Sequence, residues 1–264
     1  VDRTLKMRAI MLWLGCIFLF CLGTPQHVSS LKLSAVAGVG SAIAGLILSV
    51  ADMSATPYDQ YSPSYDKLNG GSATKYLGID EMRQRAGEYT QGDVLELAVG
   101  TGLQTAYYDW NRVRSFTGID NSQGMLDEAR QRLNGLLAGK SGVSSKLLQS
   151  DVGKIDLADS QFDTVIDTFS ICVFDRPAEA VAEMRRLVRP ITGRVLLLEN
   201  SRSTNVVLGF VQDATESLIT PLSKGCRWNV DVPRLAQEAG LTPVEGEGGS
   251  IQLGTISLGV YSKK

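Results

Sequence analysis

Acidic and polar side chains stand near the ends of several apolar, strand-like runs of this chain. A glycine turn between a strand and a helix lets backbone N–H groups approach a nucleotide-like ligand. An acid about 18 residues beyond such a turn can accept hydrogen bonds from both hydroxyls of a ribose. The side chains in question are Glu96 with the turn Gly100-Thr101-Gly102, then Asp120, Asp151, Asp167 and Thr168.

The negative charge of the side chains at these strand ends limits the kinds of ligand that we expect. Acidic groups suit a ligand that carries a positive charge and lacks phosphates, which points away from dinucleotides. A nicotinamide-dependent oxidoreductase on a similar sheet is the main rival enzyme. Its G-x-G-x-x-G/A fingerprint would place Thr105 at the last position, and the chain contains no Tyr-x-x-x-Lys pair.

Composition excludes other classes of function. The net charge of -2 and the pI near 5.6 argue against a general nucleic-acid binder, because no basic excess is present to neutralise phosphates. The single histidine, His27, precedes the segments with strand-like patterns, so histidine metal sites and Ser-His-Asp chemistry are not expected there. No CxxC pair occurs, and a disulfide between Cys172 and Cys226 is possible.

Strand-like and helix-like segments alternate from Asp93 onward, which predicts a doubly wound, mostly parallel α/β sheet with helices on both faces. The expected strands are 93–97, 115–119, 146–149, 162–166 and 194–198, followed by two runs in 241–264 that form an antiparallel C-terminal hairpin around 245–250. The expected helices are 72–89, 103–110, one capped by Ser122, one capped by Asp175, 205–218 and 232–240.

Two apolar runs, residues 9–23 and 33–51, precede this region, and Arg8 and Lys32 are the only charged residues between Met7 and Ala51. The first run resembles the apolar part of a secretory signal, and the second approaches the length of a membrane span. The pattern is also typical of composite organelle-targeting sequences. We expect one or two apolar N-terminal helices that are removed after targeting, retained as a membrane anchor, or buried.

Four motifs, in order and at the expected separations, resemble the class I S-adenosylmethionine-dependent methyltransferases. Within these, the chain is most similar to the ubiquinone/menaquinone-biosynthesis C-methyltransferase-like group, including its membrane-anchored relatives. The resemblance extends from about residue 58 to the C-terminus. The motifs are residues 94–102 (VLELAVGTG), 117–126 (TGIDNSQGML), 162–165 (FDTV) and 187–199 (LVRPITGRVLLLE).

The resemblance implies a seven-stranded Rossmann-like methyltransferase fold, with residues 1–54 as a targeting or anchoring segment, 55–91 as a helical lid or linker and 92–264 as the methyltransferase domain. It implies S-adenosyl-L-methionine as the cofactor. Gly100 and Gly102 would contact its methionine part, Glu96 its amino group, Asp120 the ribose, Met125 the adenine ring and Asp151 the adenine amine. Thr168 would line the methionine pocket. The remaining expected cofactor contacts are Tyr65, Thr101, Asn121 and Val152.

The predicted reaction is transfer of the sulfonium methyl to a small, hydrophobic acceptor, with Asp167 and Tyr65 as candidate bases. The expected partners are the small-molecule acceptor, a membrane and a membrane protein complex. The expected location is a mitochondrion, a plastid or the endomembrane system. Neither nucleic acid nor metal is expected to bind. The alternative is a catalytically silent, membrane-associated assembly subunit. Ala98, where relatives carry glycine, and Asn200, where relatives often carry histidine, keep that alternative open.

Overall fold

The computed structural model describes residues 57–69, 77–223 and 225–264. Its strands are β1 (Gly92–Leu97), β2 (Val113–Asp120), β3 (Ser144–Gln149), β4 (Thr164–Thr168), β5 (Arg194–Asn200), β6 (Thr242–Pro243), β7 (Gly249–Ile251) and β8 (Ile256–Ser262). Its α-helices are α3 (Pro57–Asn69), α5 (Ile79–Tyr89), α6 (Gln123–Leu137), α7 (Pro177–Leu187), α8 (Val206–Ile219) and α9 (Val232–Glu238). Short 3-10 helices are η1 (Leu103–Tyr107), η2 (Ile171–Val173), η3 (Thr220–Ser223) and η4 (Gln252–Gly254).

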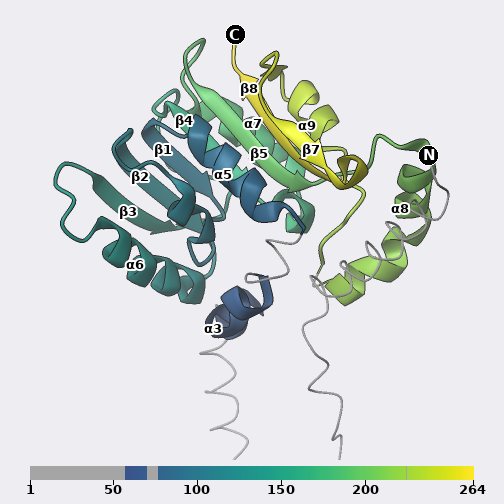
Figure 1. Cartoon of the computed structure of the whole chain (residues 1–264), viewed down its shortest axis with the longest axis horizontal. Coiled ribbons are helices and arrows are strands. Elements are labelled where there is room, and N and C mark those ends of the chain that lie inside the picture. The colour runs from purple at the N-terminus through teal and green to yellow at the C-terminus, as the bar shows by residue number, and fades with distance from the viewer. Residues whose placement is uncertain (1–56, 70–76, 224) are drawn as a thin grey trace, which may run out of the picture.

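One twisted sheet forms the centre of the molecule (Figure 1). Its strand order is β3-β2-β1-β4-β5-β8-β6, and the short β7 pairs with β8 outside this path. Strands β1 to β5 are parallel, whereas β6, β7 and β8 pair in antiparallel fashion. The chain moves outward from β1 to β3 and then returns to place β4 on the other side of β1. Ligands of doubly wound sheets bind at such a switch point, beside the carboxyl ends of the strands.

Alternate strand residues build two hydrophobic cores, one on each face of the sheet. Val94, Ile166 and Leu196 point to the face that α5 and α6 cover. Leu95, Val165, Leu197 and their neighbours point to the opposite face, under α7 and α9. Figure 1 shows α5 in front of the sheet and α7 and α9 behind it. This three-layer arrangement confirms the doubly wound α/β fold, because a parallel sheet must bury both faces.

The C-terminal region differs in detail from the expected hairpin. β6 and β8 are the two antiparallel strands that the sequence predicts, but β7 begins at Gly249, within the segment expected to be the turn. Gly248 and Gly249, which both have positive φ angles of 83° and 156°, allow the chain to bend back against β8. The seven strands of the main path are those expected, and β7 is an eighth.

Two local expectations are wrong. Residues 103–110 form only the 3-10 helix η1, which ends at Tyr107 because Tyr108 turns inward to a buried position. Helix α7 begins after Arg176 rather than Asp175, and no side chain caps it. The Ser122 cap of α6 is as predicted, since its hydroxyl accepts a hydrogen bond from the Met125 amide at 3.2 Å.

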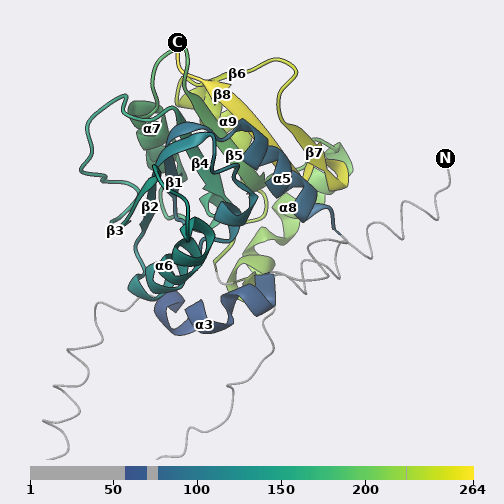
Figure 2. The ribbon, with the colours of Figure 1, turned by 60° about the vertical axis from the view of Figure 1, so that its left-hand side comes forward.

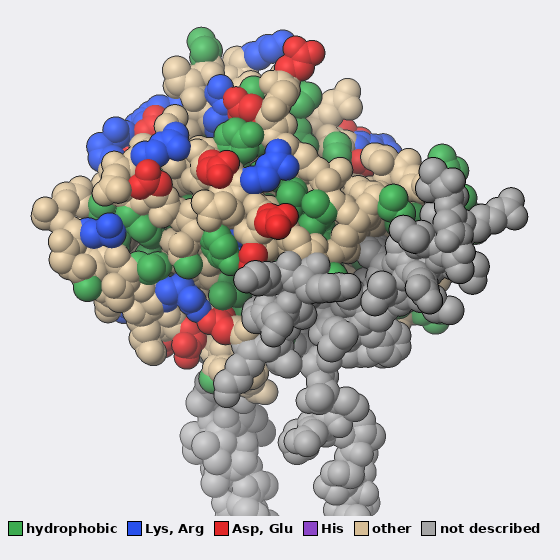
Figure 3. Space-filling model, in the orientation of Figure 1, with side chains coloured by type: hydrophobic (Ala, Val, Ile, Leu, Met, Phe, Trp, Pro, Cys, Tyr) green, Lys and Arg blue, Asp and Glu red, His purple; other side chains and the backbone are tan. Residues whose placement is uncertain are grey.

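The described surface mixes charges of both signs. On the face shown in Figure 3, Lys and Arg side chains are interspersed with Asp and Glu side chains. Among the described helices, none is both long and apolar enough to cross a bilayer. The expected targeting or anchoring segment, residues 1–54, and the first part of the helix expected at 72–89 lie outside the described residues.

Candidate functional site

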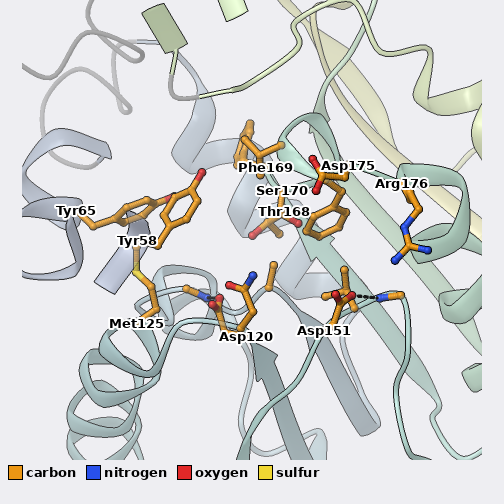
Figure 4. A pocket seen from close by; sticks show the side chains of 17 residues that line it. Tyr58, Tyr65, Asp120, Met125, Asp151, Thr168, Phe169, Ser170, Asp175 and Arg176 are labelled. Carbon is orange, nitrogen blue, oxygen red and sulfur yellow. Dashed lines mark hydrogen bonds between the residues drawn. The ribbon is translucent and has the colours of Figure 1, made fainter. Parts of the chain in front are cut away.

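A pocket of about 220 Å³ opens at the carboxyl ends of β1, β2 and β4, at the switch point of the sheet. Figure 4 shows its side chains converging from α3, α6 and the loops that follow the strands. Eight of the predicted cofactor-site residues line it: Tyr65, Gly100, Asp120, Asn121, Met125, Asp151, Val152 and Thr168. The other lining residues are Tyr58, Ala98, Gly153, Phe169, Ser170, Val173, Phe174, Asp175 and Arg176.

Asp120 is held rigidly at the end of β2. Its Oδ2 atom accepts a hydrogen bond from the Gly100 amide at 2.9 Å, and its Oδ1 atom accepts one from the Ser122 amide at 2.9 Å. The carboxyl group is 7% exposed, and burial raises its pKa while the backbone hydrogen bonds oppose the rise. Each carboxylate oxygen has a second lone pair, so Asp120 retains acceptor capacity for a ligand in the pocket.

Three alternate residues of the turn after β1, at positions 98, 100 and 102, have positive φ angles. Gly100 and Gly102 have φ angles of 55° and 76°, which glycine adopts without cost. Ala98, where relatives carry glycine, also has a positive φ, 43°. A non-glycine residue in this region costs on the order of 1 kcal/mol. Ala98 is therefore a strained residue in the wall of the pocket, where a glycine would fit better.

Glu96 lies beneath the pocket rather than in its wall. Its side chain is 1% exposed and accepts a hydrogen bond from the Tyr108 hydroxyl at 2.7 Å. Burial raises the pKa of Glu96 to about 8, against the opposing effects of the Tyr108 hydrogen bond and the charge of Arg83. The side chain is therefore largely protonated at neutral pH when the pocket holds no cation.

Helix α3 attaches to the rest of the site through two aspartates. Asp59 Oδ1 accepts hydrogen bonds from the Ser122 hydroxyl at 2.7 Å and the Gly124 amide at 2.8 Å, which fixes α3 to the start of α6. Asp66 accepts a hydrogen bond from the Thr101 hydroxyl at 2.6 Å and pairs with Arg132 of α6.

Thr101 and Gly102 lie next to the pocket but do not line it. Thr101 does not line the pocket but connects the glycine turn to α3, and its carbonyl oxygen accepts a hydrogen bond from Arg132 Nε at 2.9 Å. Gly102 begins η1 in the left-handed conformation. Glu96, Thr101 and Gly102 thus surround the pocket without forming its wall.

Two tyrosines of α3 cover one side of the pocket. Tyr58 and Tyr65 lie in Figure 4 on the side of Met125 and face the opening between α6 and the loop after β4. Burial raises the pKa of Tyr65 to about 12 and raises that of Tyr58 further. Both hydroxyls are therefore neutral at physiological pH.

Asp151 lies in the loop after β3, at the opposite side of the pocket (Figure 4). Its Oδ1 atom accepts a hydrogen bond from the Gly153 amide at 2.7 Å. This hydrogen bond closes a local turn, and Asp151 lines the pocket beside Val152 and Gly153.

The loop after β4 supplies lining residues that sequence analysis did not identify. Phe169 has a φ of 60°, and the Arg83 guanidinium lies 5.1 Å from the centre of its ring. Ser170, Val173 and Phe174 follow in the same wall. The sequence could have identified these residues by their position directly after a predicted strand, because the loops that follow the strands of such sheets form the binding site.

Asp167, a predicted candidate base, is completely buried behind this loop. Its Oδ1 atom accepts a hydrogen bond from the hydroxyl of Ser170, which lines the pocket. The backbone amide of Ser170 donates a hydrogen bond at 3.2 Å to Oε1 of Glu199, at the end of β5, so Ser170 contacts both buried carboxyl groups. Burial raises the pKa of both groups, and that of Glu199 is raised further by the Asp167 charge. Both carboxyl groups therefore hold a proton more readily than exposed carboxyl groups do.

Comparisons with known proteins agree with this geometry. Residues 95–196 match the family model described as a methyltransferase domain. This match identifies residues 95–196 as a methyltransferase domain. Methyltransferases with this fold take the methyl group from S-adenosylmethionine, which confirms the predicted cofactor and the predicted type of enzyme domain.

This chain spans only part of the length of the curated relatives that it matches. The mitochondrial methyltransferase OMS1 of Saccharomyces cerevisiae is 29% identical over 71% of this chain and 42% of its own length. The ubiquinone/menaquinone biosynthesis C-methyltransferase UbiE of Azotobacter vinelandii is 33% identical over 62% of this chain and 63% of its own. A phosphatidylethanolamine N-methyltransferase of Cereibacter sphaeroides is 37% identical over 47% of this chain and 58% of its own.

Solved structures share the fold of the domain. An O-methyltransferase family protein from Burkholderia thailandensis superposes with a TM-score of 0.56 at 19% identity, covering 73% of this chain and 57% of that one. An S-adenosylmethionine-dependent methyltransferase from Thermotoga maritima gives 0.54 at 18% identity, covering 78% and 98%. At these identities the likeness concerns the fold alone.

Proposed function

We propose that the protein transfers the methyl group of S-adenosylmethionine to a small hydrophobic acceptor. The observation that carries this proposal is the carboxylate of Asp120, which two backbone amides hold at the wall of a pocket at the sheet's switch point. A carboxylate held in this way can accept hydrogen bonds from ribose hydroxyls, and its negative charge suits a ligand that carries a positive charge. When bound, the cofactor supplies an electrophilic methyl group on its sulfonium.

In this proposal each wall of the pocket holds one part of the cofactor. Asp120 binds the ribose hydroxyls, and Met125 with Asn121 contacts the adenine ring. Asp151 and Val152 bind its outer edge, while Gly100 and Thr168 lie along the methionine part. Glu96 lies beneath Gly100, where the ammonium group of the ligand would favour its ionised form. The division of the chain into residues 1–54, 55–91 and 92–264 belongs to the same proposal.

The character of the remaining wall supports a hydrophobic acceptor. Four large apolar or aromatic side chains line the pocket, namely those of Tyr58, Phe169, Val173 and Phe174. Two of the relatives carry names that state quinone biosynthesis or a phospholipid, both hydrophobic compounds. Val207 and Phe210 of α8, which follows the carboxyl end of β5, are each 70% exposed and add apolar surface at this end of the sheet.

This apolar surface and the uncharged runs at residues 9–23 and 33–51 support a membrane-associated location for the whole protein. The Saccharomyces relative is named as mitochondrial, which supports an organelle. A membrane protein complex would be a compatible partner.

The buried carboxyl groups of Asp167 and Glu199 are the proposed destination of the proton that the acceptor loses. Ser170 lines the pocket, donates its hydroxyl hydrogen to Asp167 and donates its amide hydrogen to Glu199. In our proposal Ser170 takes a proton from the acceptor as it passes its own to the pair. The domain otherwise contributes by positioning the two reactants at near-attack distance.

Calorimetric titration of the full chain with S-adenosylhomocysteine tests the proposal. We expect binding, and Asp120→Ala should weaken it about tenfold or more, because a charge-assisted hydrogen bond contributes roughly 1.5–3 kcal/mol. Asp127→Ala is the matched control, since Asp127 is an exposed residue of α6 that pairs only with its neighbours Arg130 and Gln123. Absence of heat up to millimolar ligand would contradict the enzyme proposal and favour a silent subunit.

A further inference from the structure

Two cysteines from distant parts of the chain meet beside the pocket. Cys172 lies in η2, in the loop after β4, and Cys226 lies between η3 and α9, 54 residues further along the chain. Their Sγ atoms are 2.7 Å apart. A disulfide bond is about 2.0 Å long, so the sulfurs need to approach by less than about 1 Å to form one.

The segments that carry the two thiols are already held together. The Arg227 amide donates a hydrogen bond to the Cys172 carbonyl oxygen at 3.0 Å, and the Arg227 guanidinium donates to the carbonyl oxygen of Phe174. Val173 and Phe174, which directly follow Cys172, line the pocket. The thiol pair therefore lies next to two lining residues of the pocket.

The two thiols differ in access and acidity. Cys172 is 2% exposed, whereas Cys226 is partly exposed. The pKa of Cys226 is lowered, first by its contact with the Cys172 thiol and then by the Asn200 side chain and the charge of Arg227. Since the thiolate is the nucleophile in disulfide exchange, Cys226 is the residue that reacts first.

We propose that Cys172 and Cys226 are a redox-active thiol pair that closes as a disulfide when the protein meets a small-molecule disulfide. The Cys226 thiolate attacks one sulfur of that compound, breaks its S–S bond and releases one thiolate. The Cys172 sulfur then displaces the second thiolate from Cys226, and the Cys172 proton passes to a released thiolate. Two protein thiols are oxidised and one small disulfide is reduced to two thiols.

The closed pair would fix the loop before α9 to the pocket wall without a large movement. The disulfide therefore acts as a lock on the native structure rather than as a barrier to the cofactor. This inference depends on the position of the sulfurs and is independent of the proposed methyl transfer.

The experiment incubates the full, folded chain with excess oxidised glutathione, followed by peptide mapping and thermal unfolding. We expect a peptide that joins Cys172 to Cys226. We also expect the Tm to rise by about 5–10 °C, the shift for closing a loop of this length in a domain of this size. Dithiothreitol should reverse both changes.

Single serine variants separate the two roles. Cys172→Ser should stop at a glutathione adduct on Cys226, whereas Cys226→Ser should form no crosslink at Cys172 and keep its Tm under oxidation. The chain also contains Cys16 and Cys21, and peptide mapping distinguishes links to them. The proposal is wrong if folded wild-type protein keeps both thiols reduced, joins Cys226 to Cys16 or Cys21, or links Cys172 to Cys226 only after unfolding in urea.

Discussion

Glu96 lies at the end of β1 with its carboxyl group removed from water and hydrogen-bonded by the Tyr108 hydroxyl. Its folded-state pKa of about 8 lies well above the value near 4.5 of an exposed glutamate. Between these two values the folded protein holds a proton that the unfolded chain releases. The free energy of unfolding contributed by Glu96 therefore falls as the pH rises from about 4.5 to about 8.

Glu96→Gln should remove this pH dependence, because glutamine keeps the acceptor for Tyr108 and does not ionise. We expect the two proteins to have similar stability near pH 5. Between pH 5 and 8 the wild type should lose up to about 1.4 kcal/mol per pH unit relative to the variant. Urea unfolding at several pH values measures the difference, and parallel stability curves would show that Glu96 is already ionised.

Helix α3 shows how one element can complete a site from a distance in sequence. It supplies Tyr58 and Tyr65 to the pocket, and its contacts with the domain run through Asp59 and Asp66. Figure 2 shows α3 lying across the end of the molecule beside the start of α6. Because two side chains make the hydrogen bonds that fix this helix to α6 and to the glycine turn, we expect α3 to open locally before the sheet unfolds.

Asp59→Ala should release α3 locally. The variant loses the acceptor for the Ser122 hydroxyl and the Gly124 amide, which together hold the helix to α6. We expect amide hydrogen exchange across residues 57–69 to become at least about tenfold faster, as loss of roughly 1.5–3 kcal/mol would produce. Exchange in β1, β4 and β5 should not change.

Asp127→Ala again serves as the control, because Asp127 pairs with Arg130 on the exposed surface of α6 and has no hydrogen bond or ion pair with the described residues of α3. Uniformly faster exchange over the whole sheet in Asp59→Ala would instead mean that α3 belongs to the cooperative core.

At the scale of the whole molecule, the two ends of the sheet have different roles. The carboxyl ends carry the pocket, whereas the amino ends carry a cluster of two acids and two arginines. Asp93 receives hydrogen bonds from Arg114 at 2.5 and 3.0 Å and from Arg189 at 3.0 Å, and both arginines also pair with Asp163. The cluster joins β1, β2, the start of β4 and the end of α7.

The pKa of Asp93 is held well below its usual range, first by the Arg114 hydrogen bonds. A depressed folded-state pKa contributes stability above the unfolded value near 3.9, which is lost as the pH falls further. Asp93→Asn should therefore destabilise the protein by about 1–3 kcal/mol at pH 7, and by progressively less below pH 4.

Chemical denaturation at pH 7 and pH 3 measures this effect. Asp127→Asn, which removes an exposed pair with Arg130, should change stability by less than about 1 kcal/mol at either pH. An equal loss at both pH values for Asp93→Asn would mean that packing, rather than charge, accounts for the role of Asp93.

The sequence by itself determined the order of strands and helices, because alternating apolar runs and strand-end acids are local patterns that a parallel sheet must satisfy. It also identified eight residues that the fold gathers around one pocket, since the carboxyl ends of neighbouring parallel strands meet at one edge. Asp120 and Met125 are examples whose positions follow from a strand and its capped helix.

Only the tertiary structure decided which of these side chains face the pocket. Glu96 precedes the glycine turn as expected, yet it lies beneath the wall because Tyr108, twelve residues later, folds over it. Separate strands and loops are also joined by the hydrogen bonds of Ser170 to Asp167 and Glu199. The Cys172–Cys226 pair likewise joins two separate loops. Such contacts depend on the register and twist of the whole sheet, which no local pattern of residues specifies.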